Sequence, residues 1–462
     1  MTVKRLKEGD DTNPAIAPDI KIINFSIGDS FRPFQKNLSS WAKLIDWLSY
    51  KYDLLFIVSA GNYSDNFVLN IKSYEFDELD SNQIQNISLQ HIVETNFNRK
   101  ILTPAESINS LTVGASHFDY SEANNLYQRI NLITADNLIS PISRIGFGYK
   151  KSIKPEILMP GGRKLYRKQP IQDLEGKTKF FIESQPFSAH PPGNKAALPG
   201  PEGSNNSTGY LCGTSNATAL ASRLAAQIYD VLVKLNQENT GVTINSDFFT
   251  VIIKSMLAHG ASWDRSSNVL EETLQNLPGT AANTAKRNIL PYIGYGRVNA
   301  EKVLFCTDQR VTLIGYGQLS NKNAHLFDFP IPPSIGQQRI NKKLVVTLAY
   351  NSPLNFQTRK YRKAQLYFDN ISDNSPLTLN RSYYDFRTAQ SGTVQHDILE
   401  GDKADVFIDG DAINIKVNCR EDAGGLTEAV KYGLCVTFEV QEQIPIYDEI
   451  QQRIIQRVRP NV

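Results

Sequence analysis

The chain has 462 residues, which is enough for about three domains of ordinary size. Hydrophobic residues make up 41% of the sequence and charged residues 21%, a composition that excludes collagen-like and wholly disordered proteins. The 49 Lys and Arg side chains nearly balance the 47 Asp and Glu side chains. This balance argues against a chain-wide basic field, so we expect no nucleic acid and no membrane as partner.

The four cysteines form no C-x-x-C pair, which excludes zinc ribbons and disulfide scaffolds and favours a reducing, cytoplasmic compartment. The longest apolar run, residues 54–60, has the length of one strand, whereas a membrane-spanning helix needs about 20 residues. No signal-peptide pattern opens the sequence. Residues 1–9 have the pattern of the last turns of an amphipathic helix, so we expect a further segment upstream in the natural protein.

Residues 1–305 alternate apolar strands with helices. The run IKIINFSI at 20–27 is nearly continuous and β-branched, as in a strand that is covered on both faces. Apolar residues at helical spacing follow at 39–52, and a second buried strand follows at 54–60. Strand, helix and strand in close succession form a βαβ unit, so we predict an α/β fold with a parallel sheet.

Two segments interrupt this alternation. Residues 65–100 are Asn-rich and acidic, and because their spacing matches no EF-hand we predict a solvated helical insertion rather than a calcium loop. Residues 186–209 are rich in Pro, Gly, Ser and Asn without periodicity, which predicts a loop. Apolar stripes then predict a long helix at 216–235 and a second helix at 246–259.

After residue 305 the pattern changes to short alternating runs that turn residues separate. Such runs are typical of an antiparallel β-sandwich, here of about seven or eight strands. We therefore predict a first domain at 1–305, a β-sandwich domain at 306–445 and an amphipathic helical tail at 446–462.

Ser215 is the first candidate for chemistry. The small residues Gly213 and Thr214 place it at the start of the long helix, where its hydroxyl is exposed and its N–H lies at the positive helix end. An isolated Gly-Thr-Ser before a helix is more often a helix cap.

Two strand ends supply the other candidates. Asn62 closes a Ser-Ala-Gly-Asn turn, where its amide can donate to a developing oxyanion, although such an Asn is more often a turn former. Ser26, Ile27 and Gly28 end the neighbouring strand, and the glycine lets an extended peptide approach closely. Taken alone, the segment Ser26–Gly28 has the pattern of an ordinary strand end.

Taken in chain order, these segments resemble the subtilisin-like serine peptidases (subtilases) over residues 20–305. IINFSIG resembles the strand with the substrate-binding end, FIVSAGN the oxyanion-hole segment and CGTSNATALASRLAA the nucleophile block with its helix. TPAESINSLTVGAS, SRIGFG with KPEILMPGG, and YGRVNAEKVL resemble the remaining core blocks. No block is decisive alone, but their common order is a specific signal.

The resemblance implies a subtilisin-like three-layer fold and a serine endopeptidase that acts on proteins or peptides through an acyl-enzyme. Ser215 is then the nucleophile, and the Asn62 side chain with the Ser215 N–H forms the oxyanion hole. The substrate backbone pairs with Ser26, Ile27 and Gly28. The remaining substrate-binding positions implied are Ser59, Ala60, Gly61, Gly213 and Thr214, of which the first three wall the pocket for the residue before the cut.

The chain departs from the family pattern at Asn216, where Met is usual, and at Ala219, where Pro is usual. We expect no cofactor, and we identify no metal-ligand set. The sandwich and the IPIYDEI tail resemble large intracellular bacterial subtilases that are encoded beside an AAA-type ATPase, which implies such an ATPase as a second partner.

The family's Asp-Thr/Ser-Gly and His-Gly-Thr-x-Val blocks are missing from the sequence. Without the imidazole base a serine hydroxyl is a poor nucleophile, and loss of that base costs about 10⁶-fold in rate in subtilisin. We therefore expect the C-terminal part of a protease, whose catalytic Asp and His lie outside this chain.

Two other classes remain. The chain is alternatively a catalytically inactive scaffold or regulatory subunit that binds peptides in the same cleft. Gly28-Asp29-Ser30 also resembles the nucleophile block of GDS-type esterases, but the Asp-x-x-His pair of that family is missing.

Overall fold

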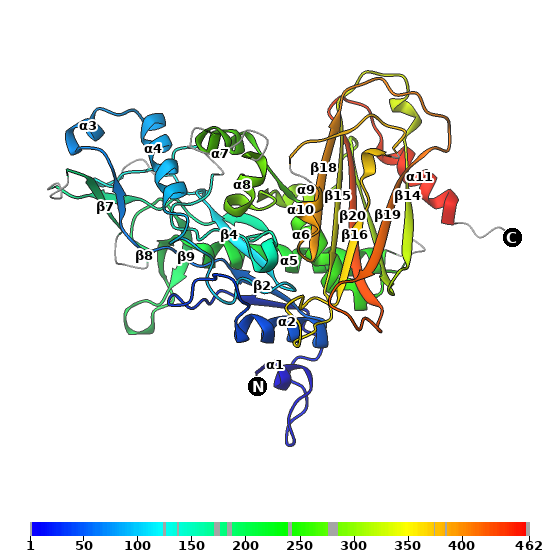
Figure 1. Cartoon of the computed structure of the whole chain (residues 1–462), viewed down its shortest axis with the longest axis horizontal. Helices are drawn as coiled ribbons and strands as arrows, with labels where there is room; N and C mark the ends of the chain where they lie inside the picture. The colour runs from blue at the N-terminus through cyan, green and yellow to red at the C-terminus, as the bar shows by residue number, and fades with distance from the viewer. Residues whose placement is uncertain are drawn as a thin grey trace.

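The computed structural model describes residues 2–122, 126–135, 138–170, 176–182, 187–238, 243–275, 285–373, 375–383 and 386–458. A parallel sheet with its helices forms one half of the molecule, and two antiparallel sheets stand beside it (Figure 1). The α/β fold with a parallel sheet, predicted from the sequence, is confirmed. Within the described residues, every helix is too short or too polar to cross a lipid bilayer.

The central sheet has six strands in the order β1-β2-β4-β5-β12-β11. Its strands are β1 (Ile22–Phe25), β2 (Leu55–Ser59), β4 (Leu111–Ser116), β5 (Ile157–Pro160), β12 (Arg297–Val298) and β11 (Ala261–Ser262). The strands from β1 to β12 pair in parallel, and only β11 is antiparallel. Every residue of β2, β4 and β5 is buried because helices cover both faces, which explains their continuous apolar runs.

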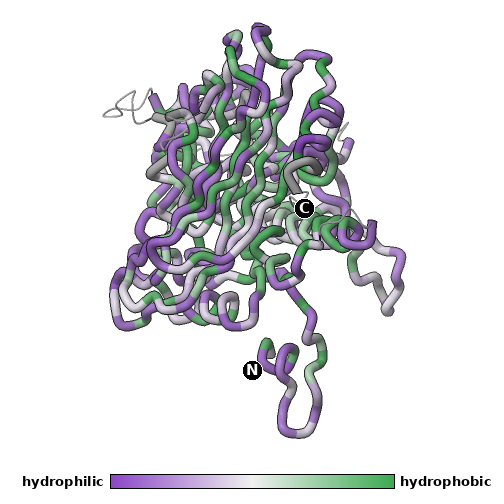
Figure 2. Tube along the Cα trace, turned by 90° about the vertical axis from the view of Figure 1, so that its right-hand side faces the viewer, coloured by the Kyte–Doolittle hydropathy of each residue, from purple (hydrophilic) through white to green (hydrophobic). Residues whose placement is uncertain are grey.

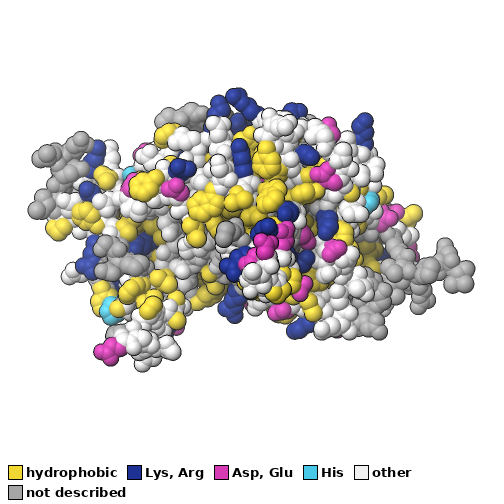
Figure 3. Space-filling view, turned by 90° about the horizontal axis from the view of Figure 1, so that it is seen from below, with side chains coloured by type: hydrophobic (Ala, Val, Ile, Leu, Met, Phe, Trp, Pro, Cys, Tyr) yellow, Lys and Arg dark blue, Asp and Glu magenta, His cyan; other side chains and the backbone are white. Residues whose placement is uncertain are grey.

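Two helices pack on this sheet near the candidate residues, and α5 itself begins with two of them, Thr214 and Ser215. In α2 (Ser40–Tyr52), which connects β1 to β2, the Ser39 side chain caps the first turn by accepting a hydrogen bond from Ala42 N at 3.0 Å. The long helix α5 (Thr214–Gln237) packs across β1, β2, β4 and β5 through its apolar stripe. Leu44 and Trp47 of α2 are exposed. Helix α2 lies on the lower side of the molecule in Figure 1, and Figure 3 shows hydrophobic side chains gathered on that side.

The insertion at 65–100 contains helices, as its composition predicts. It comprises β3 (Phe67–Leu69), α3 (Ser73–Asp77) and α4 (Ser81–Glu94). Asp80 caps α4, because its carboxylate accepts hydrogen bonds from the N–H groups of Asn82 and Gln83. β3 joins a small antiparallel sheet with β7 (Thr178–Ile182) and β6 (Tyr166–Lys168).

The prediction of a loop at 186–209 was wrong at three short strands and holds for the described residues between them, while residue 186 lies outside the described residues. The segment folds into β8 (Phe187–Ser188), β9 (Asn194–Leu198) and β10 (Ser207–Leu211), a three-stranded antiparallel sheet. Its residues are mostly exposed or half-buried, so backbone pairing rather than an apolar face organises it. A sheet of this kind leaves no hydrophobic periodicity in the sequence.

The C-terminal part contains the antiparallel strands that the alternating pattern predicts. A five-stranded sheet has the order β13-β20-β15-β18-β17, and a three-stranded sheet the order β14-β19-β16. The strands are β13 (Arg310–Leu319), β14 (Ala324–Pro330), β15 (Lys342–Tyr350), β16 (Ala364–Phe368), β17 (Asn380–Arg381), β18 (Val394–Gly401), β19 (Ala412–Glu421) and β20 (Val430–Val440). Residues of both sheets share one hydrophobic core, and Figure 2 shows hydrophobic stretches along these strands.

Short helices complete the chain. They are α1 (Thr2–Lys7), α7 (Arg265–Gln275), α8 (Ala285–Ile293), α9 (Ala300–Leu304), α10 (Phe386–Ala389) and α11 (Tyr447–Val458). The last of them falls within the predicted helical tail, and α1 lies below α2 in Figure 1, where Val3 packs against a hydrophobic cluster of the first half. The domain boundaries at 305 and 445 stay predictions.

The helix α6 (Phe249–His259) joins the two halves, and all of its residues are buried. One side faces the parallel sheet, and the other packs on β15 and β20. β20 approaches closely because Gly433 lacks a side chain: a Cβ there would lie 2.6 Å from the carbonyl oxygen of Val251. The buried ammonium of Lys254 donates to the carbonyl oxygens of Asn109 (2.8 Å) and Tyr350 (3.0 Å), one from each half.

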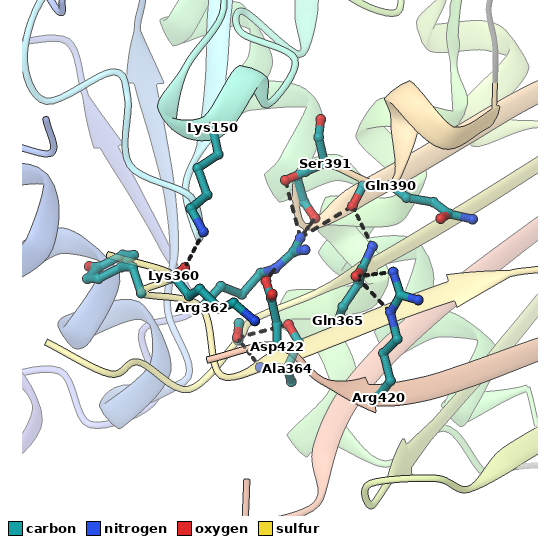
Figure 4. Close-up of polar contacts among 12 residues, drawn as sticks. Lys150, Lys360, Arg362, Ala364, Gln365, Gln390, Ser391, Arg420 and Asp422 are labelled. Atoms are coloured by element: carbon teal, nitrogen blue, oxygen red, sulfur yellow. Dashed lines mark hydrogen bonds and ion pairs between the residues drawn. The ribbon is translucent and has the colours of Figure 1, made fainter. Parts of the chain in front are cut away.

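A second set of polar contacts lies at the edge of this junction (Figure 4). Lys150 Nζ, from the turn before β5, donates to the carbonyl oxygen of Lys360 at 3.3 Å. Arg362 forms an ion pair with Asp422 at 3.3 Å and donates to the carbonyl oxygen of Ser391 at 3.2 Å. The Lys150 contact ties the turn to the C-terminal part, and the Arg362 contacts hold the receiving segment within that part.

Candidate active site

Ser215 lies in the first turn of α5, and its side chain is exposed. The helix begins after Gly213, whose φ of +151° is a conformation that favours glycine. A Cβ on Gly213 would lie 3.0 Å from Nδ2 of Asn62, so the turn also needs glycine for space. The Gly213 N–H donates to the carbonyl oxygen of Gly161 at 2.8 Å, which fixes the turn against the end of β5.

Asn62 and Thr214 come together directly beside the serine. Oδ1 of Asn62 accepts hydrogen bonds from the Thr214 backbone N–H at 2.9 Å and from its hydroxyl at 3.0 Å. A backbone N–H can only donate, so Oδ1 must face Thr214 and the Nδ2 group points the other way. The side-chain amide thus caps α5 with its oxygen and keeps its two N–H donors for another acceptor.

Ser26 lies on the other side of the nucleophile. Oγ of Ser215 and the carbonyl oxygen of Ser26 are 3.5 Å apart, and Oγ of Ser26 donates to Asn24 Oδ1 at 2.7 Å. Ile27 and Gly28, which follow, are exposed. Because β1 is the edge strand among the described strands, this segment has a side on which an extended peptide can pair.

Ser59, Ala60 and Gly61 are all buried, so they face the site through their backbone rather than through exposed side chains. Ala60 N–H donates to the carbonyl oxygen of Val113 at 2.9 Å, which continues the pairing of β2 with β4. Gly61 has a φ of +98°, where a residue with a side chain would be strained. The structure therefore brings Ser26–Gly28, Ser59–Asn62 and Gly213–Ser215 together where β1 and β2 end and α5 begins.

Sequence reasoning missed two residues that hold this edge. Arg144 is nearly buried, and its Nε donates to the carbonyl oxygen of Asn62 at 3.0 Å while its Nη1 donates to that of Lys100 at 3.0 Å. Burial lowers the pKa of this guanidinium. Leu102 packs against Gly28 and Gly61. Arg144 lies in the SRIGFG block and Leu102 directly precedes the TPAESINSLTVGAS block, but only their long-range contacts reveal what they do.

No histidine contact with Ser215 is found in the described part of the chain, where the six histidines have other partners. His91 packs on Phe67, His117 bonds Asn131, His190 stacks on Tyr127, His259 and His396 bond Thr347, and His325 bonds Tyr432. Burial lowers the pKa of His91 to about 4 and that of His259 to about 3. Both are therefore weak bases at neutral pH.

Other reactive groups at this edge do not compete with the serine. Burial raises the pKa of the Cys212 thiol to about 12, so the thiol stays protonated at neutral pH and is a poor nucleophile. Asp29 forms a turn, because its Oδ1 accepts a hydrogen bond from the Phe31 N–H at 3.0 Å. The described residues bring together no group of three His, Cys, Asp or Glu side chains able to hold a metal ion.

Comparison with known proteins gives the family of the chain. The family model of the subtilase family matches residues 6–296, which is more than half of the sequence, so the chain belongs to the subtilase family. It is 24% identical over 346 residues to the uncharacterized protein y4bN of Sinorhizobium fredii (strain NBRC 101917 / NGR234), covering 74% of this chain and 69% of that protein. Among solved structures it is similar to the MycP3 protease from the type VII (ESX-3) secretion system, with 16% identity and a TM-score of 0.22. That match covers 62% of this chain and only 53% of the protease chain.

Proposed function

We propose that this chain carries the nucleophile and the oxyanion hole of a serine endopeptidase that cleaves peptide bonds through an acyl-enzyme on Ser215. One observation carries the proposal: the Ser215 hydroxyl is exposed at a helix N-terminus beside an Asn62 amide whose oxygen is fixed by Thr214. A mere helix cap needs the oxygen of Asn62. It does not need an exposed serine next to the free amide donors.

In the proposed reaction, an extended substrate pairs with Ser26–Gly28 and sets its scissile carbonyl between Ser215 Oγ and Asn62 Nδ2. The bond from Oγ to the carbonyl carbon forms as the hydroxyl proton passes to a base. The negative oxygen then accepts hydrogen bonds from Asn62 Nδ2 and the Ser215 N–H, with the positive end of α5 behind them. The amine leaves with a proton, and water hydrolyses the ester.

The base in this proposal is a His, oriented by an Asp, from a polypeptide segment outside the described residues. This assignment rests on the missing sequence blocks and on the other contacts that the six histidines make. The proposed substrates are proteins or peptides. An AAA-type ATPase stays a proposed partner and the cytoplasm a proposed compartment.

The test uses the protein purified from its own cells through a C-terminal tag, together with the polypeptides that co-purify. A fluorogenic peptide library should be cleaved by this preparation, and Ser215→Ala should abolish cleavage. Ser222→Ala is a matched control, because Ser222 lies two turns further along α5 and its hydroxyl bonds the Thr218 carbonyl oxygen at 2.8 Å. Cleavage that survives Ser215→Ala overturns the proposal.

The second candidate function is a peptide-binding scaffold without catalysis, which the contacts of the histidines favour. It predicts that the same preparation binds peptides at the β1 edge but cleaves none of them. An esterase at Ser30 has weaker support because Asp29, its neighbour, serves as a turn former. The esterase hypothesis requires ester hydrolysis that Ser30→Ala abolishes and Ser215→Ala leaves unchanged.

A further inference from the structure

Two buried arginines lie directly behind Asn62, the candidate oxyanion-hole residue. Arg144 is 9% exposed, and its Nε donates to the carbonyl oxygen of Asn62 at 3.0 Å. The backbone N–H of Arg144 donates to the carbonyl oxygen of Gly61, also at 3.0 Å. Arg99 is fully buried, and its Nη1 donates to the carbonyl oxygen of Pro141 at 2.6 Å. Arg144 thus holds the backbone of the residue whose amide donors the proposed function uses.

Both guanidinium groups lie against the ring of Tyr63, the residue that follows Asn62. The guanidinium carbon of Arg99 is 4.1 Å from the ring centroid, and that of Arg144 is 5.7 Å from it. Cation–π contacts of this kind offset part of the cost of burying a positive charge. Because an aromatic ring carries no net charge, it stabilises the two cations without cancelling their electric field.

A carboxylate in contact with these arginines would cancel that field. Within the described residues neither arginine forms an ion pair, and every hydrogen bond that they donate goes to a neutral oxygen. Nη2 of Arg99 is buried without a hydrogen-bond partner in the same part of the chain. The carboxylate of Asp65 attracts both cations, but it is exposed, where water screens its charge. Buried charges are normally paired, so two unpaired cations behind one side chain indicate a function for their charge.

The charge of Arg144 acts on the Asn62 amide over a short distance. Nε is 3.0 Å from the Asn62 carbonyl oxygen, and covalent geometry keeps that oxygen within about 6 Å of Nδ2 in the same residue. The guanidinium therefore lies within about 9 Å of the amide donors. At an effective dielectric constant of about 20, a charge at about 9–12 Å stabilises an anion by about one pKa unit. The exposure of Asn62 reduces this to about 0.5–1 unit.

We propose that Arg144 and Arg99 are positioning residues that keep the oxyanion hole electropositive. Arg144 fixes the backbone of Asn62, and the two unpaired charges favour the negative oxygen that forms in the reaction over the neutral carbonyl of the substrate. The inference rests on the proposed function and adds a fixed positive field to its oxyanion hole. In the competing explanation the arginines only bind carbonyl oxygens of the loops, and their charge has no effect at residue 62.

The first experiment measures the field without any catalysis. Asn62→Cys places a thiol at the site, in a background in which Cys306→Ser removes the exposed natural cysteine. The rate of alkylation by iodoacetamide as a function of pH gives the pKa of the new thiol, because only the thiolate reacts. The other three cysteines do not interfere, since burial raises the pKa of Cys212 to about 12, of Cys419 to about 11 and of Cys435 to about 12. We expect the pKa of the new thiol to lie below the ordinary value of about 8.5.

Substitutions of the arginines then separate charge from hydrogen bonding. Arg144→Gln removes the charge and should raise the pKa of the new thiol by about 0.5–1 unit. Arg144→Lys keeps the charge but cannot reach all three carbonyl oxygens that Arg144 binds, and it should leave the thiol pKa unchanged. Arg99→Met and Arg99→Lys repeat the comparison for the second charge. Equal thiol pKa values in the Gln and Lys variants of Arg144 overturn the proposal.

Two further variants complete this experiment. Arg362→Gln is the matched control, because Arg362 is also 9% exposed and donates to carbonyl oxygens, but in the C-terminal part; the thiol pKa should stay the same. Asp65→Asn removes an exposed negative charge and should lower the thiol pKa by about 0.3 unit, opposite in sign to Arg144→Gln. If Arg144→Gln does not fold, Asp65→Asn decides alone, and an unchanged or raised thiol pKa contradicts the proposal.

The second experiment measures peptide cleavage by the tagged preparation, with Asn62 intact. Arg144→Gln should lower kcat by about 3- to 10-fold, the rate equivalent of 0.5–1 pKa unit, with little change in KM. Arg144→Lys should retain kcat, and Arg362→Gln should change neither constant. An equal loss of kcat in the Gln and Lys variants contradicts the proposal. Cleavage that survives Ser215→Ala overturns the proposed function instead, and the thiol titration still decides whether the field exists.

Discussion

Oδ1 and Nδ2 of the Asn62 side-chain amide have different roles, and substitutions can separate the two roles. Oδ1 accepts two hydrogen bonds from Thr214 at 2.9 and 3.0 Å, which holds the start of α5. The Nδ2 group supplies the proposed oxyanion donor. Asn62→Asp keeps an acceptor for Thr214 and removes the donor, whereas Asn62→Ala removes both.

The expected magnitudes differ accordingly. Leaving the Thr214 N–H without its partner costs about 1–3 kcal/mol of stability, so Asn62→Ala should be destabilised by that amount. The unfolding free energy of Asn62→Asp should lie within about 1 kcal/mol of the wild-type value, because a carboxylate near a helix N-terminus contributes about 0.3–1 kcal/mol of stability. Loss of one oxyanion donor lowers kcat by about 10²–10³-fold, or about 2.7–4 kcal/mol, in both variants.

The assay measures urea unfolding and peptide cleavage on the same variants. The KM should change little, because the donor acts on the transition state and not on the bound substrate. The control pair is Asn299→Asp and Asn299→Ala. Asn299 caps α9 in the same manner, accepting from the N–H groups of Glu301 at 2.9 Å and Lys302 at 3.2 Å, and has no place in the site.

Two results would refute this reasoning. If Asn62→Asp retains the wild-type kcat, Asn62 is not an oxyanion donor and only caps α5. If Asn62→Asp is as unstable as Asn62→Ala, the acceptor role of Oδ1 is wrong. The Asn299 variants should reproduce the difference in stability between Asp and Ala with cleavage unchanged.

Three further predictions follow from the structure. Ser215→Ala should abolish cleavage and change the unfolding free energy by less than about 0.5 kcal/mol, because its side chain is exposed; a larger change contradicts the exposure. Gly213→Ala should abolish cleavage because the new Cβ would lie 3.0 Å from Asn62 Nδ2, at a backbone φ of +151°. Gly176→Ala is the control for backbone strain alone, because Gly176 has a φ of +76° and a Cβ there would have no atom within 4 Å. Equal cleavage by these two variants would contradict the steric argument. Burial lowers the pKa of Lys254 from 10.5 to about 7, so the unfolded chain binds this proton more tightly and the unfolding free energy should rise between pH 7 and 10.5. Lys254→Met should reduce that rise in unfolding free energy by up to about 5 kcal/mol, as measured by urea unfolding at each pH. A rise that stays the same in Lys254→Met would refute the prediction.

The parallel sheet and its main helices were predictable because burial on both faces leaves continuous apolar runs. IKIINFSI and the run at 54–60 became β1 and β2, and the apolar stripe after Ser215 became α5. A different reason made it predictable that the ends of β1 and β2 lie close together, since parallel strands end at a common edge of the sheet. Their order along the chain also identified the subtilase family correctly.

The parts that could not be predicted depend on contacts between distant segments. The strands β8, β9 and β10 have no apolar face, so nothing in their composition marks them as strands. Leu102 looks like an ordinary core residue in its segment, and only its position against Gly28 and Gly61 gives it a role. The pattern of α6 predicts a helix, but it does not show that β15 and β20 cover its second side.

Because α6 is buried on two sides, its two sides are covered at different times while the chain is synthesised. Its inner side can pack as soon as the parallel sheet forms, but its other side waits for β20, which ends at Val440. About 180 residues lie between the end of α6 and the end of β20, and ribosomes add about 5–20 residues per second. The apolar side of α6 is therefore exposed for about 10–35 s in each new chain, an interval in which a chaperone can bind it or two nascent chains can associate.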